Sequence, residues 1–555
     1  MNKNIKVKIL TLFKQKNFIK LENFLIKTLK KEKPTAFLLN LLGLSKIQKP
    51  NINNQDLSEG LNYFKKAYLK DNSYLDALFN YALLGLNLND YEVPLKKLVE
   101  LSKKEYNPKV FLTLSRIFFF EGKIQKAHNL LKEVFLKNGL SFKTSSHFLS
   151  TFNYIFSDSQ NEYLNYCQLV QKQFKLNECI KFEHKRLKKI KKLNIGFVSP
   201  DFCNHAISHF LLGTLEQLKN KNLELHAFNL REQKGFDETT LLYKNTFHKW
   251  HDVYDQNSFE IAKTIKNQNI DILFDICGYF SRNRFDIFFF KPAPIQISWL
   301  GYLNSTGNKN IDYIIADPYL IESKDKKNFV EKIIYMPNIW NCHSRIKNKT
   351  RIKDSPFKKN KYITFGSFNN SAKFSEQALN TWSEILLKKK DSHLILKSVN
   401  PNAEKSHSYI KNFFNEKKID SSRVRLFQRT TTRDEHYEFY NQIDLSLDTF
   451  PYPGITTSFE SIYMGVPVLT LKGKNYLSRT GYSINKNLNL TDFIATDIHE
   501  YIKKAVEIDK NRNSLENLRK NLREIALRSP LFDMENFGRN FYRLLQKTWK
   551  NYNLK

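Results

Sequence analysis

The sequence contains few cysteines, and they form no paired motif. Its five cysteines are widely spaced and include no Cys-x-x-Cys pair: Cys167, Cys179, Cys203, Cys277 and Cys342. An odd number of separate cysteines favours neither a disulfide framework nor a structural zinc site. We therefore expect free thiols in a reducing compartment.

The chain also lacks long hydrophobic runs. One of the longest, FDIFFFKPAPIQISWLGY at residues 285–302, is interrupted by Lys291 and by prolines. A membrane-spanning helix needs about 20 consecutive apolar residues. The first residues, MNKNIKVKILTLFKQKNF, contain only about five apolar residues in a row, fewer than the core of a signal peptide requires. We expect no membrane span and a cytoplasmic location.

Acidic residues are scarce relative to basic ones. The chain has 89 Lys and Arg against 55 Asp and Glu, which gives a formal net charge of +34. Such an excess raises the hypothesis of nucleic-acid binding. However, lysines occur in every segment together with many Asn, Ile and Phe residues, which indicates a compositional bias rather than a basic patch. We expect no nucleic-acid partner.

Residues 1–180 show helical periodicity and no strand pattern. Similar helical phrases begin about 34 residues apart, at Phe18, Leu57, Tyr91 and Ile124. Seven residues after each start stands an apolar side chain: Leu25, Phe64, Leu98 and Leu131. The pattern resembles tetratricopeptide repeats, whose stacked helix pairs leave a concave face for peptides. An ordinary helical bundle is the alternative.

After a basic linker at residues 181–192, short β-branched and aromatic runs alternate with helical patterns, which predicts parallel sheets flanked by helices. The first set of strands is LNIGFVS, LELHAFNL, IDILFDIC, IQISWLGY, DYIIAD and KIIYMP, and the second is YITFGSF, HLILKS, RVRLFQ, DLSLDTF and PVLTLKG. We predict two Rossmann-like α/β domains at residues 193–345 and 360–555. A ligand would bind between them, at the carboxyl ends of the strands.

The second predicted domain carries groups suited to a diphosphate, whereas the chain has neither a G-x-G-x-x-G nor a P-loop motif. Lys373 follows a strand, and Thr456 and Thr457 stand at a helix start, where free N–H groups attract phosphate. Glu460 lies about one turn into that helix, a suitable place for a ribose diol. Together these residues predict a nucleotide-diphosphate site. Taken singly, a threonine at a helix start is more often an N-cap, and a lone lysine is usually solvated.

The segment 193–548 resembles the O-GlcNAc transferase family, glycosyltransferase family 41. The stretches that carry the resemblance are IGFVSPDFCNHAISHF, CGYFSRNRFDIFFFKPAPIQISWLGYLNSTG, DYIIADP, FGSFNNSAKFS, DTFPYPGITTSFESIYMGVPVLTLKGKNYLSRTG and SPLFDMENF. The resemblance implies a GT-B fold preceded by tetratricopeptide-like repeats that bind protein acceptors. It also implies an inverting enzyme, without metal or other cofactor, that moves GlcNAc from UDP-GlcNAc to Ser or Thr of proteins.

The resemblance also implies roles for individual residues. Lys373 matches a lysine at the diphosphate, Thr456 and Thr457 match the phosphate-binding helix start, and Glu460 matches the acid at the ribose. Further nucleotide positions are matched by Asn370, Arg433 and His436. His205 matches a histidine that faces sugar and acceptor, and Gly301 begins a loop, GYLNSTG, that lines the donor site.

Several alternatives stay open. His205 is a candidate general base or acceptor-orienting group, or else a structural histidine at a strand end. His436 either contacts the ligand or caps a helix. Ile455 and Leu303 replace a histidine and a proline usual in relatives. The alternative functions are therefore O-fucosyl or N-glucosyl transfer on the same fold, and a non-catalytic repeat scaffold.

Overall fold

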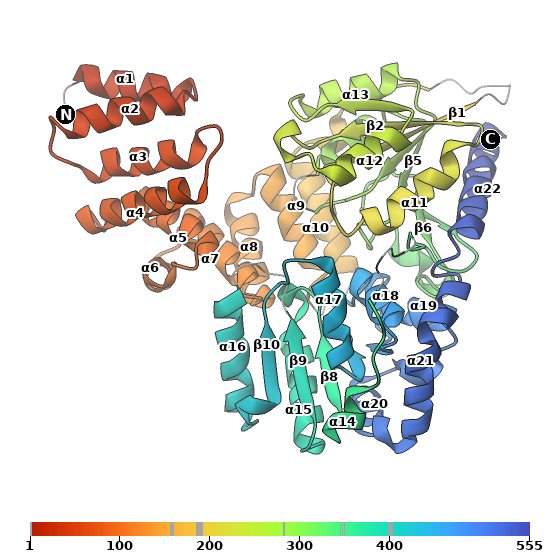
Figure 1. The fold of residues 1–555 in the computed structure, drawn as a ribbon. Helices are drawn as coiled ribbons and strands as arrows, with labels where there is room; N and C mark the ends of the chain where they lie inside the picture. The colour runs from red at the N-terminus through yellow and green to blue at the C-terminus, as the bar shows by residue number, and fades with distance from the viewer. Residues whose placement is uncertain are drawn as a thin grey trace. The chain divides into compact units, whose positions relative to one another are not determined.

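The computed structural model describes residues 3–155, 160–184, 192–280, 283–344, 346, 348, 350–397 and 403–554 (Figure 1). The chain divides into two compact units. The first comprises Met1–Asn138 with Asn402–Tyr409, and the second comprises Gly139–Pro401 with Ile410–Lys555. Most of the predicted linker at 181–192 lies outside the described residues.

The first unit is built from helices that pack on their neighbours in the chain. They are α1 (Lys3–Lys14), α2 (Phe18–Leu29), α3 (Ala36–Gln48), α4 (Asn54–Lys70), α5 (Leu75–Asn87), α6 (Glu92–Lys104), α7 (Pro108–Phe120) and α8 (Ile124–Asn138). The predicted phrases coincide with every second helix, because Phe18 begins α2, Ile124 begins α8 and Tyr91 caps α6. Leu25, Phe64, Leu98 and Leu131 are all buried. The region is a helical repeat array.

The second unit contains two parallel sheets. The first has the order β3-β2-β1-β4-β5-β6-β7. Its strands are β1 (Leu193–Ser199), β2 (Leu223–Asn229), β3 (Lys249–Asp252), β4 (Ile272–Asp275), β5 (Ile295–Ser298), β6 (Tyr313–Ala316) and β7 (Lys332–Tyr335). The connecting helices are α11 (Ser208–Lys219), α12 (Glu238–Thr246) and α13 (Ser258–Asn267). We call this part the first α/β domain.

The second sheet has the order β10-β9-β8-β11-β12-β13. Its strands are β8 (Thr364–Ser367), β9 (His393–Lys397), β10 (Val424–Phe427), β11 (Leu445–Leu447), β12 (Val468–Leu471) and β13 (Ile494–Ala495). Its helices are α14 (Pro356–Asn360), α15 (Glu376–Lys388), α16 (Ala403–Glu416), α17 (Arg433–Phe439), α18 (Thr456–Tyr463), α19 (Thr480–Asn487), α20 (Ile498–Val506) and α21 (Arg512–Arg528). We call this part the second α/β domain.

Helices from both ends of the second unit join the two α/β domains. The last helix, α22 (Met534–Asn553), returns from the second domain and runs beside α11 in Figure 1. Its Phe541 ring packs on Trp299 of the first domain, with ring centroids 4.6 Å apart. Helices α9 (Phe142–Thr151) and α10 (Gln160–Gln173) fall within the predicted helical domain 1–180 but belong to the second unit. One continuous cluster of buried apolar side chains runs through both α/β domains.

All the predicted strands are confirmed, whereas two strands escaped prediction. Strand β3 reads KWHD and is partly exposed at the edge of its sheet, so it has no apolar signal. Strand β13 has only two residues and also lies at an edge. These two strands form because they pair with β2 and β12, and their local sequences do not indicate strands.

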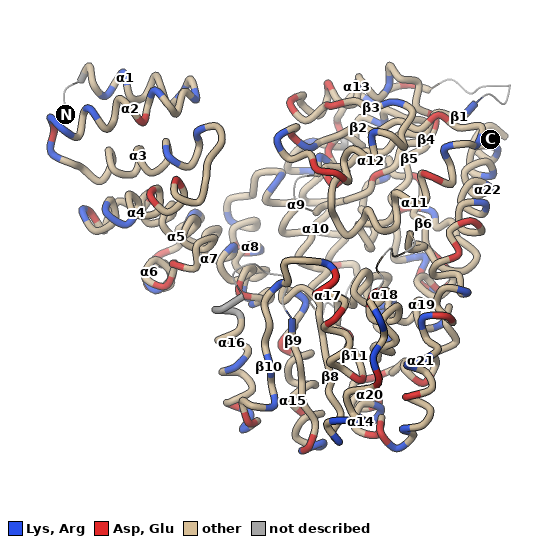
Figure 2. Tube along the Cα trace, in the orientation of Figure 1, with Lys and Arg blue, Asp and Glu red and all other residues tan. Residues whose placement is uncertain are grey.

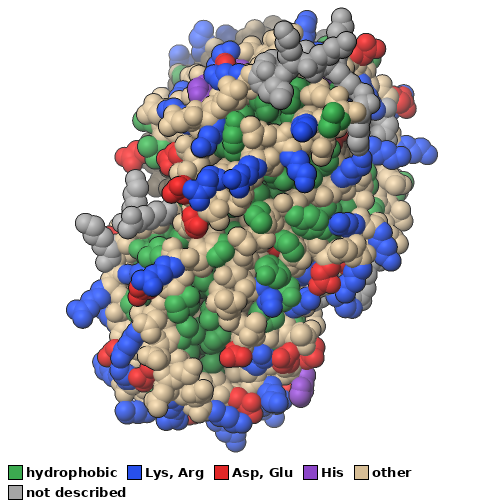
Figure 3. Space-filling model, turned by 90° about the vertical axis from the view of Figure 1, so that its right-hand side faces the viewer, with side chains coloured by type: hydrophobic (Ala, Val, Ile, Leu, Met, Phe, Trp, Pro, Cys, Tyr) green, Lys and Arg blue, Asp and Glu red, His purple; other side chains and the backbone are tan. Residues whose placement is uncertain are grey.

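Basic side chains are distributed over the whole described chain. Figure 2 shows Lys and Arg along the helices and loops of every part, interspersed with Asp and Glu. On the face in Figure 3 the basic side chains alternate with apolar and neutral ones. Within the described residues, no helix combines the length and apolar character that a bilayer crossing demands.

Candidate functional site

A buried carboxylate shapes the turn between β11 and α18. Asp448 follows β11 directly and accepts hydrogen bonds from the Gly454 N–H at 2.6 Å, the Thr449 N–H at 3.0 Å and the Thr470 hydroxyl at 2.8 Å. Burial raises the pKa of Asp448 to about 6, although these hydrogen bonds oppose the shift. The carboxylate thereby folds the Phe-Pro-Tyr-Pro-Gly turn back on the end of the strand.

The start of α18 is left without a side-chain cap. Ile455 occupies the N-cap position and offers no hydrogen-bonding side chain, and Thr456 is the first helical residue. The Thr457 hydroxyl donates to Asn369 Oδ1 at 2.8 Å, which ties the helix start to the loop after β8. A helix start of this kind presents N–H groups and the positive end of the helix dipole to an anion.

Lys373 points at the same turn. It ends a short 3-10 turn, Ser371–Lys373, after β8, and Asn370 caps that turn by accepting from the Ala372 N–H at 3.0 Å. The Lys373 ammonium donates to the Pro453 carbonyl at 2.8 Å. Burial lowers the pKa of Lys373 to about 8, against the opposing attraction of Asp448. Lys373 and the α18 start thus converge on one turn. That this turn holds a diphosphate stays a prediction.

Glu460 lies in a buried polar chain rather than in solvent. His436 Nε2 lies 3.0 Å from Glu460 Oε2, and the other ring nitrogen of His436 contacts the Lys397 ammonium. Burial acts to raise the pKa of Glu460, but the hydrogen bond and charge of His436 prevail and lower it. Burial lowers the pKa of Lys397 to about 8. The chain Lys397–His436–Glu460 is thus pre-assembled beside α18.

The structure excludes helix capping, one of the two roles left open for His436. The N-terminus of α17 is capped by Thr432, whose hydroxyl accepts from the Glu435 N–H while the Glu435 side chain returns to the Thr432 N–H. His436 therefore does not serve as the cap. Its ring belongs to the polar chain with Glu460.

Arg433 bridges the two α/β domains. Its guanidinium contacts His209 Nε2 on α11 of the first domain. The His209 ring stacks on His343, with centroids 5.2 Å apart, and burial lowers the pKa of His209 to about 3 and that of His343 to about 4. Both imidazoles are therefore neutral near pH 7, so His209 accepts from the arginine without charge repulsion.

His205 lies on the loop between β1 and α11, four residues before His209. Its side chain is 45% exposed. Its Nδ1 accepts from the Ile207 N–H at 3.4 Å and lies 3.9 Å from Asp201 Oδ2. These described partners all belong to the first α/β domain, so the structure does not join His205 to the Lys373 turn.

Gly301 is placed by close packing. Its N–H donates to the Ile276 carbonyl at 3.0 Å, and a Cβ atom at this position would lie 2.2 Å from that oxygen. No larger residue fits without moving the backbone. The glycine thereby fixes where the predicted donor-site loop leaves β5.

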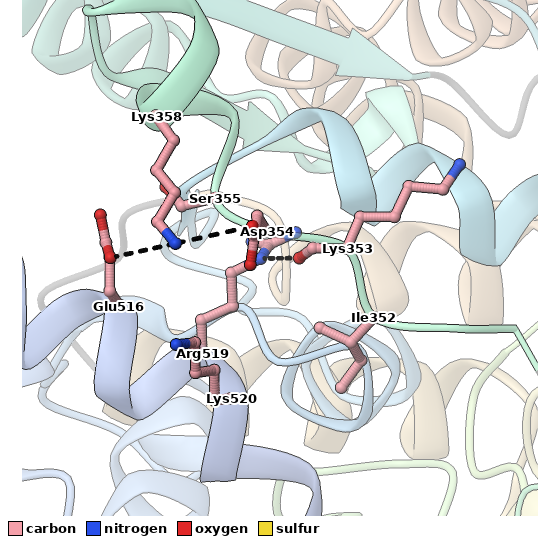
Figure 4. A pocket seen from close by; sticks show the side chains of 8 residues that line it. All are labelled: Ile352, Lys353, Asp354, Ser355, Lys358, Glu516, Arg519 and Lys520. Atoms are coloured by element: carbon pink, nitrogen blue, oxygen red, sulfur yellow. Dashed lines mark hydrogen bonds and ion pairs between the residues drawn. The ribbon is translucent and has the colours of Figure 1, made fainter.

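A separate cavity of about 150 Å³ opens between the segment before α14 and helix α21 (Figure 4). It is lined by Ile352, Lys353, Asp354, Ser355, Lys358, Glu516, Arg519 and Lys520. Lys358 Nζ lies 3.5 Å from both Asp354 Oδ2 and Glu516 Oε2. The Arg519 guanidinium donates to the Lys353 carbonyl at 2.8 Å. None of the predicted site residues lines this cavity.

Metal-ligating side chains do not cluster in the described part of the chain. Across the ranges that the structure describes, no group of three or more His, Cys, Asp or Glu side chains is arranged to hold a metal ion. Lys373 brings a positive charge to the turn before α18.

Comparison with known proteins assigns the family. The family model for glycosyl transferase family 41 matches residues 164–353 and 350–541. The chain belongs to this family. Solanum lycopersicum has a relative that is 31% identical over 364 residues, which are 65% of this chain and 39% of the relative. It is named "Probable UDP-N-acetylglucosamine–peptide N-acetylglucosaminyltransferase SPINDLY". The Arabidopsis thaliana relative named SEC is 29% identical over 405 residues, 70% of this chain and 40% of the relative.

A solved structure agrees with the fold assignment. A mutant of Thermobaculum terrenum O-GlcNAc transferase superposes with a TM-score of 0.83 at 20% identity, covering 94% of this chain and 99% of that one. The family 41 chain therefore has a helical repeat region followed by a GT-B pair of Rossmann-like domains. It spans about two fifths of the length of the plant relatives it matches.

Sequence reasoning missed several residues of the site. Lys397 ends β9, and Asp448 directly follows β11, so both stand at the carboxyl edge where ligands bind in parallel sheets. That positional signal was available from the sequence. Nothing local indicated His209 or Tyr452, because their importance arises from contacts with Arg433 and Lys373.

Proposed function

We propose that this family 41 chain is a glycosyltransferase that moves GlcNAc from UDP-GlcNAc to Ser or Thr hydroxyls of proteins, with inversion at the anomeric carbon. The names of its relatives support the donor and the peptide acceptor. Support from the structure comes chiefly from one observation, the convergence of Lys373 and the uncapped start of α18 on the same turn.

The chemistry requires stabilisation of the leaving diphosphate. As the acceptor oxygen attacks, the bond between the anomeric carbon and the diphosphate oxygen breaks, and negative charge grows on the nucleotide. The Lys373 ammonium and the N–H groups of α18 supply fixed positive charge at that position, so we propose that no metal or other cofactor is needed. Removal of one such donor costs about 10²- to 10³-fold in rate in comparable sites.

Remaining predicted residues take supporting roles in this proposal. Glu460, with His436, recognises the ribose, and Arg433 and Asn370 approach the nucleotide. His205 Nδ1 accepts from the Ile207 N–H, which leaves Nε2 as the ring nitrogen for the sugar or the acceptor. His205 stays a candidate general base or acceptor-orienting group in this proposal.

Acceptor binding is assigned to the repeats. We propose that helices α1–α8 are tetratricopeptide-like and present protein acceptors in the cytoplasm. Stacked helix pairs expose one long face to extended peptides, which suits this role.

The test is a panel of nucleotide sugars offered with host protein extract, read by mass spectrometry of the modified proteins. We expect the wild type to transfer sugar from UDP-GlcNAc. The Lys373→Ala variant should be slower by about 10²- to 10³-fold. Lys388→Ala, which alters an exposed ion pair with Glu384 on α15, is the matched control. Transfer from GDP-fucose or UDP-glucose instead would change the donor assignment. Absence of transfer from every donor would refute the proposed enzymatic activity.

A further inference from the structure

The segment of helices α9 and α10 packs against the loop that follows β5. The Tyr163 hydroxyl lies 2.7 Å from the Tyr302 hydroxyl and donates to the Ser305 carbonyl at 2.8 Å. Gln171 Nε2 donates to the Gly307 carbonyl at 2.7 Å. Gly307 has a positive φ of 64°, and a Cβ there would lie 2.7 Å from Cys167 on α10. The helix pair is thus fitted closely to the first α/β domain.

The same segment reaches the second α/β domain through one aromatic ring. Tyr154, just after α9, packs on Tyr452 with ring centroids 4.9 Å apart and planes inclined by 53°. The Lys373 ammonium lies 3.9 Å from the centroid of the Tyr452 ring. A chain of side-chain contacts therefore runs from the helical segment through Tyr452 to the lysine at the candidate diphosphate position.

We propose that Tyr154 is a positioning residue for Lys373 and acts through Tyr452. In this view the helical segment is a working part of the donor site, in addition to any role of the repeats in acceptor binding. The inference deepens the proposed function and rests on it for the meaning of Lys373.

Lys373 and Tyr154 both contact the Tyr452 ring. An ammonium over an aromatic ring is attracted by the electron-rich face, and the attraction grows when water is excluded. Tyr154 covers Tyr452 and fixes its tilt, so the ring has one orientation toward Lys373. Around the ammonium, the groups of consequence are Asp448 at the end of β11, the Pro453 carbonyl, Tyr452 and, behind it, Tyr154. The two tyrosines stay protonated near pH 8, because burial raises their pKa values.

The first measurement needs no catalytic activity. Competitive acetylation across a pH series, read by mass spectrometry of the Lys373 peptide, reports the pKa of this lysine in the full chain. We expect a value near 8 in the wild type. In Tyr154→Ala water reaches the Tyr452 ring, so the labelling pKa should rise toward the ordinary lysine value of about 10.4. Tyr154→Phe should restore the wild-type value.

The second measurement is kinetic. In Tyr154→Ala, kcat/KM for the nucleotide sugar should fall about tenfold, and Tyr154→Phe should recover most of it. Tyr154→Leu, which keeps apolar volume, should show a smaller change in the same direction and serves if the alanine variant does not fold. The control is Tyr166→Ala, which removes a ring packed on Phe148 in the same helix pair, with centroids 5.1 Å apart.

The outcomes separate the two proposals. A lower melting temperature in Tyr166→Ala with unchanged Lys373 labelling supports the specific role of Tyr154. Unchanged labelling in both Tyr154→Ala and Tyr154→Leu overturns it, and so does an equal shift in Tyr166→Ala. If the wild type transfers no sugar, the proposed function fails, while the labelling shift still decides whether Tyr154 positions Lys373.

Discussion

Lys373 is the residue on which the proposed function depends most. Its amine contacts protein groups in the free protein and would contact the diphosphate in the complex. In the free protein it donates to the Pro453 carbonyl and rests on Tyr452. A diphosphate between it and α18 would replace a neutral acceptor with a charged one, which strengthens the hydrogen bond. In the proposed function, the residue is therefore held near its working position before the donor arrives.

This arrangement predicts the pH dependence of the reaction. Burial lowers the pKa of Lys373 to about 8, so its positive charge is present below that pH and is lost as the pH rises through it. We expect kcat/KM to decline above about pH 8. Lys397 has a similarly lowered pKa. Lys373→Arg identifies the group, because arginine stays charged and should remove the decline; a decline that persists in this variant would assign it elsewhere.

Glu460 gives a second prediction at this scale. The Glu460→Gln change removes the charge that faces His436 and the proposed ribose. Hydrogen bonds to a charged group are worth about 1.5–3 kcal/mol, so the donor KM should rise about 10- to 100-fold. Because ribose contacts are the same in ground and transition states, kcat should change little. Steady-state kinetics measures both, with Glu384→Gln, an exposed side chain on α15, as control; a large loss of kcat at unchanged KM would contradict the ribose role.

At the residue scale, the sequence predicted what depends on position along an element. Lys373, Thr456 and Glu460 were found because they stand at a strand end, a helix start and one turn beyond it. The Arg433–His209 contact and the Tyr154–Tyr452 stack each join segments more than 200 residues apart, as the residue numbers show. No local pattern encodes such pairs, so they became visible only in the fold.

At the element scale, the turn before α18 depends on the absence of a side chain at Gly454. A Cβ atom there would lie 2.6 Å from both the Thr457 and the Ser458 hydroxyl oxygens. We expect Gly454→Ala to displace the helix start and to weaken UDP binding by at least about tenfold, while the melting temperature falls only slightly. Calorimetric titration with UDP measures the effect. Gly235→Ala is the control, because its Cβ would meet only the flexible Arg231 side chain; equal UDP affinity in both variants would contradict the role of the turn.

The elements themselves were largely predictable from periodicity. The buried strands of both sheets are short apolar runs, and the helices of the first unit repeat their buried positions. Helices α9 and α10 carry the same helical signal as the repeats before them. Their packing on the loop from Tyr302 to Gly307 depends on tertiary hydrogen bonds, which periodicity does not report.

At the scale of the whole molecule, Asp317 couples the two α/β domains. It follows β6 of the first domain and accepts from the Ser483 hydroxyl of α19 in the second domain at 2.6 Å. It also accepts from the N–H groups of Tyr319 at 2.9 Å and Trp340 at 3.1 Å. Burial raises the pKa of Asp317 to about 7, although these hydrogen bonds oppose the shift.

The raised pKa makes domain stability depend on pH with a definite sign. The folded state holds the Asp317 proton more tightly than the unfolded state, whose aspartate has a pKa of about 3.9. The contribution of this group to the free energy of unfolding is therefore full below pH 4 and is lost as the pH rises to 7, by at most on the order of 4 kcal/mol. Urea unfolding at pH 5 and pH 8 should show a smaller difference in Asp317→Asn than in the wild type. Parallel pH dependences would contradict this assignment.

The central claim is that Lys373 and the start of α18 hold one diphosphate. Calorimetric titration of UDP and uridine against the wild type and Lys373→Ala tests it most directly. We predict that the wild type binds UDP at least about tenfold more tightly than uridine, and that Lys373→Ala loses most of this preference while uridine affinity stays the same. Equal affinities for UDP and uridine in the wild type, or a preference that Lys373→Ala retains in full, would contradict the claim.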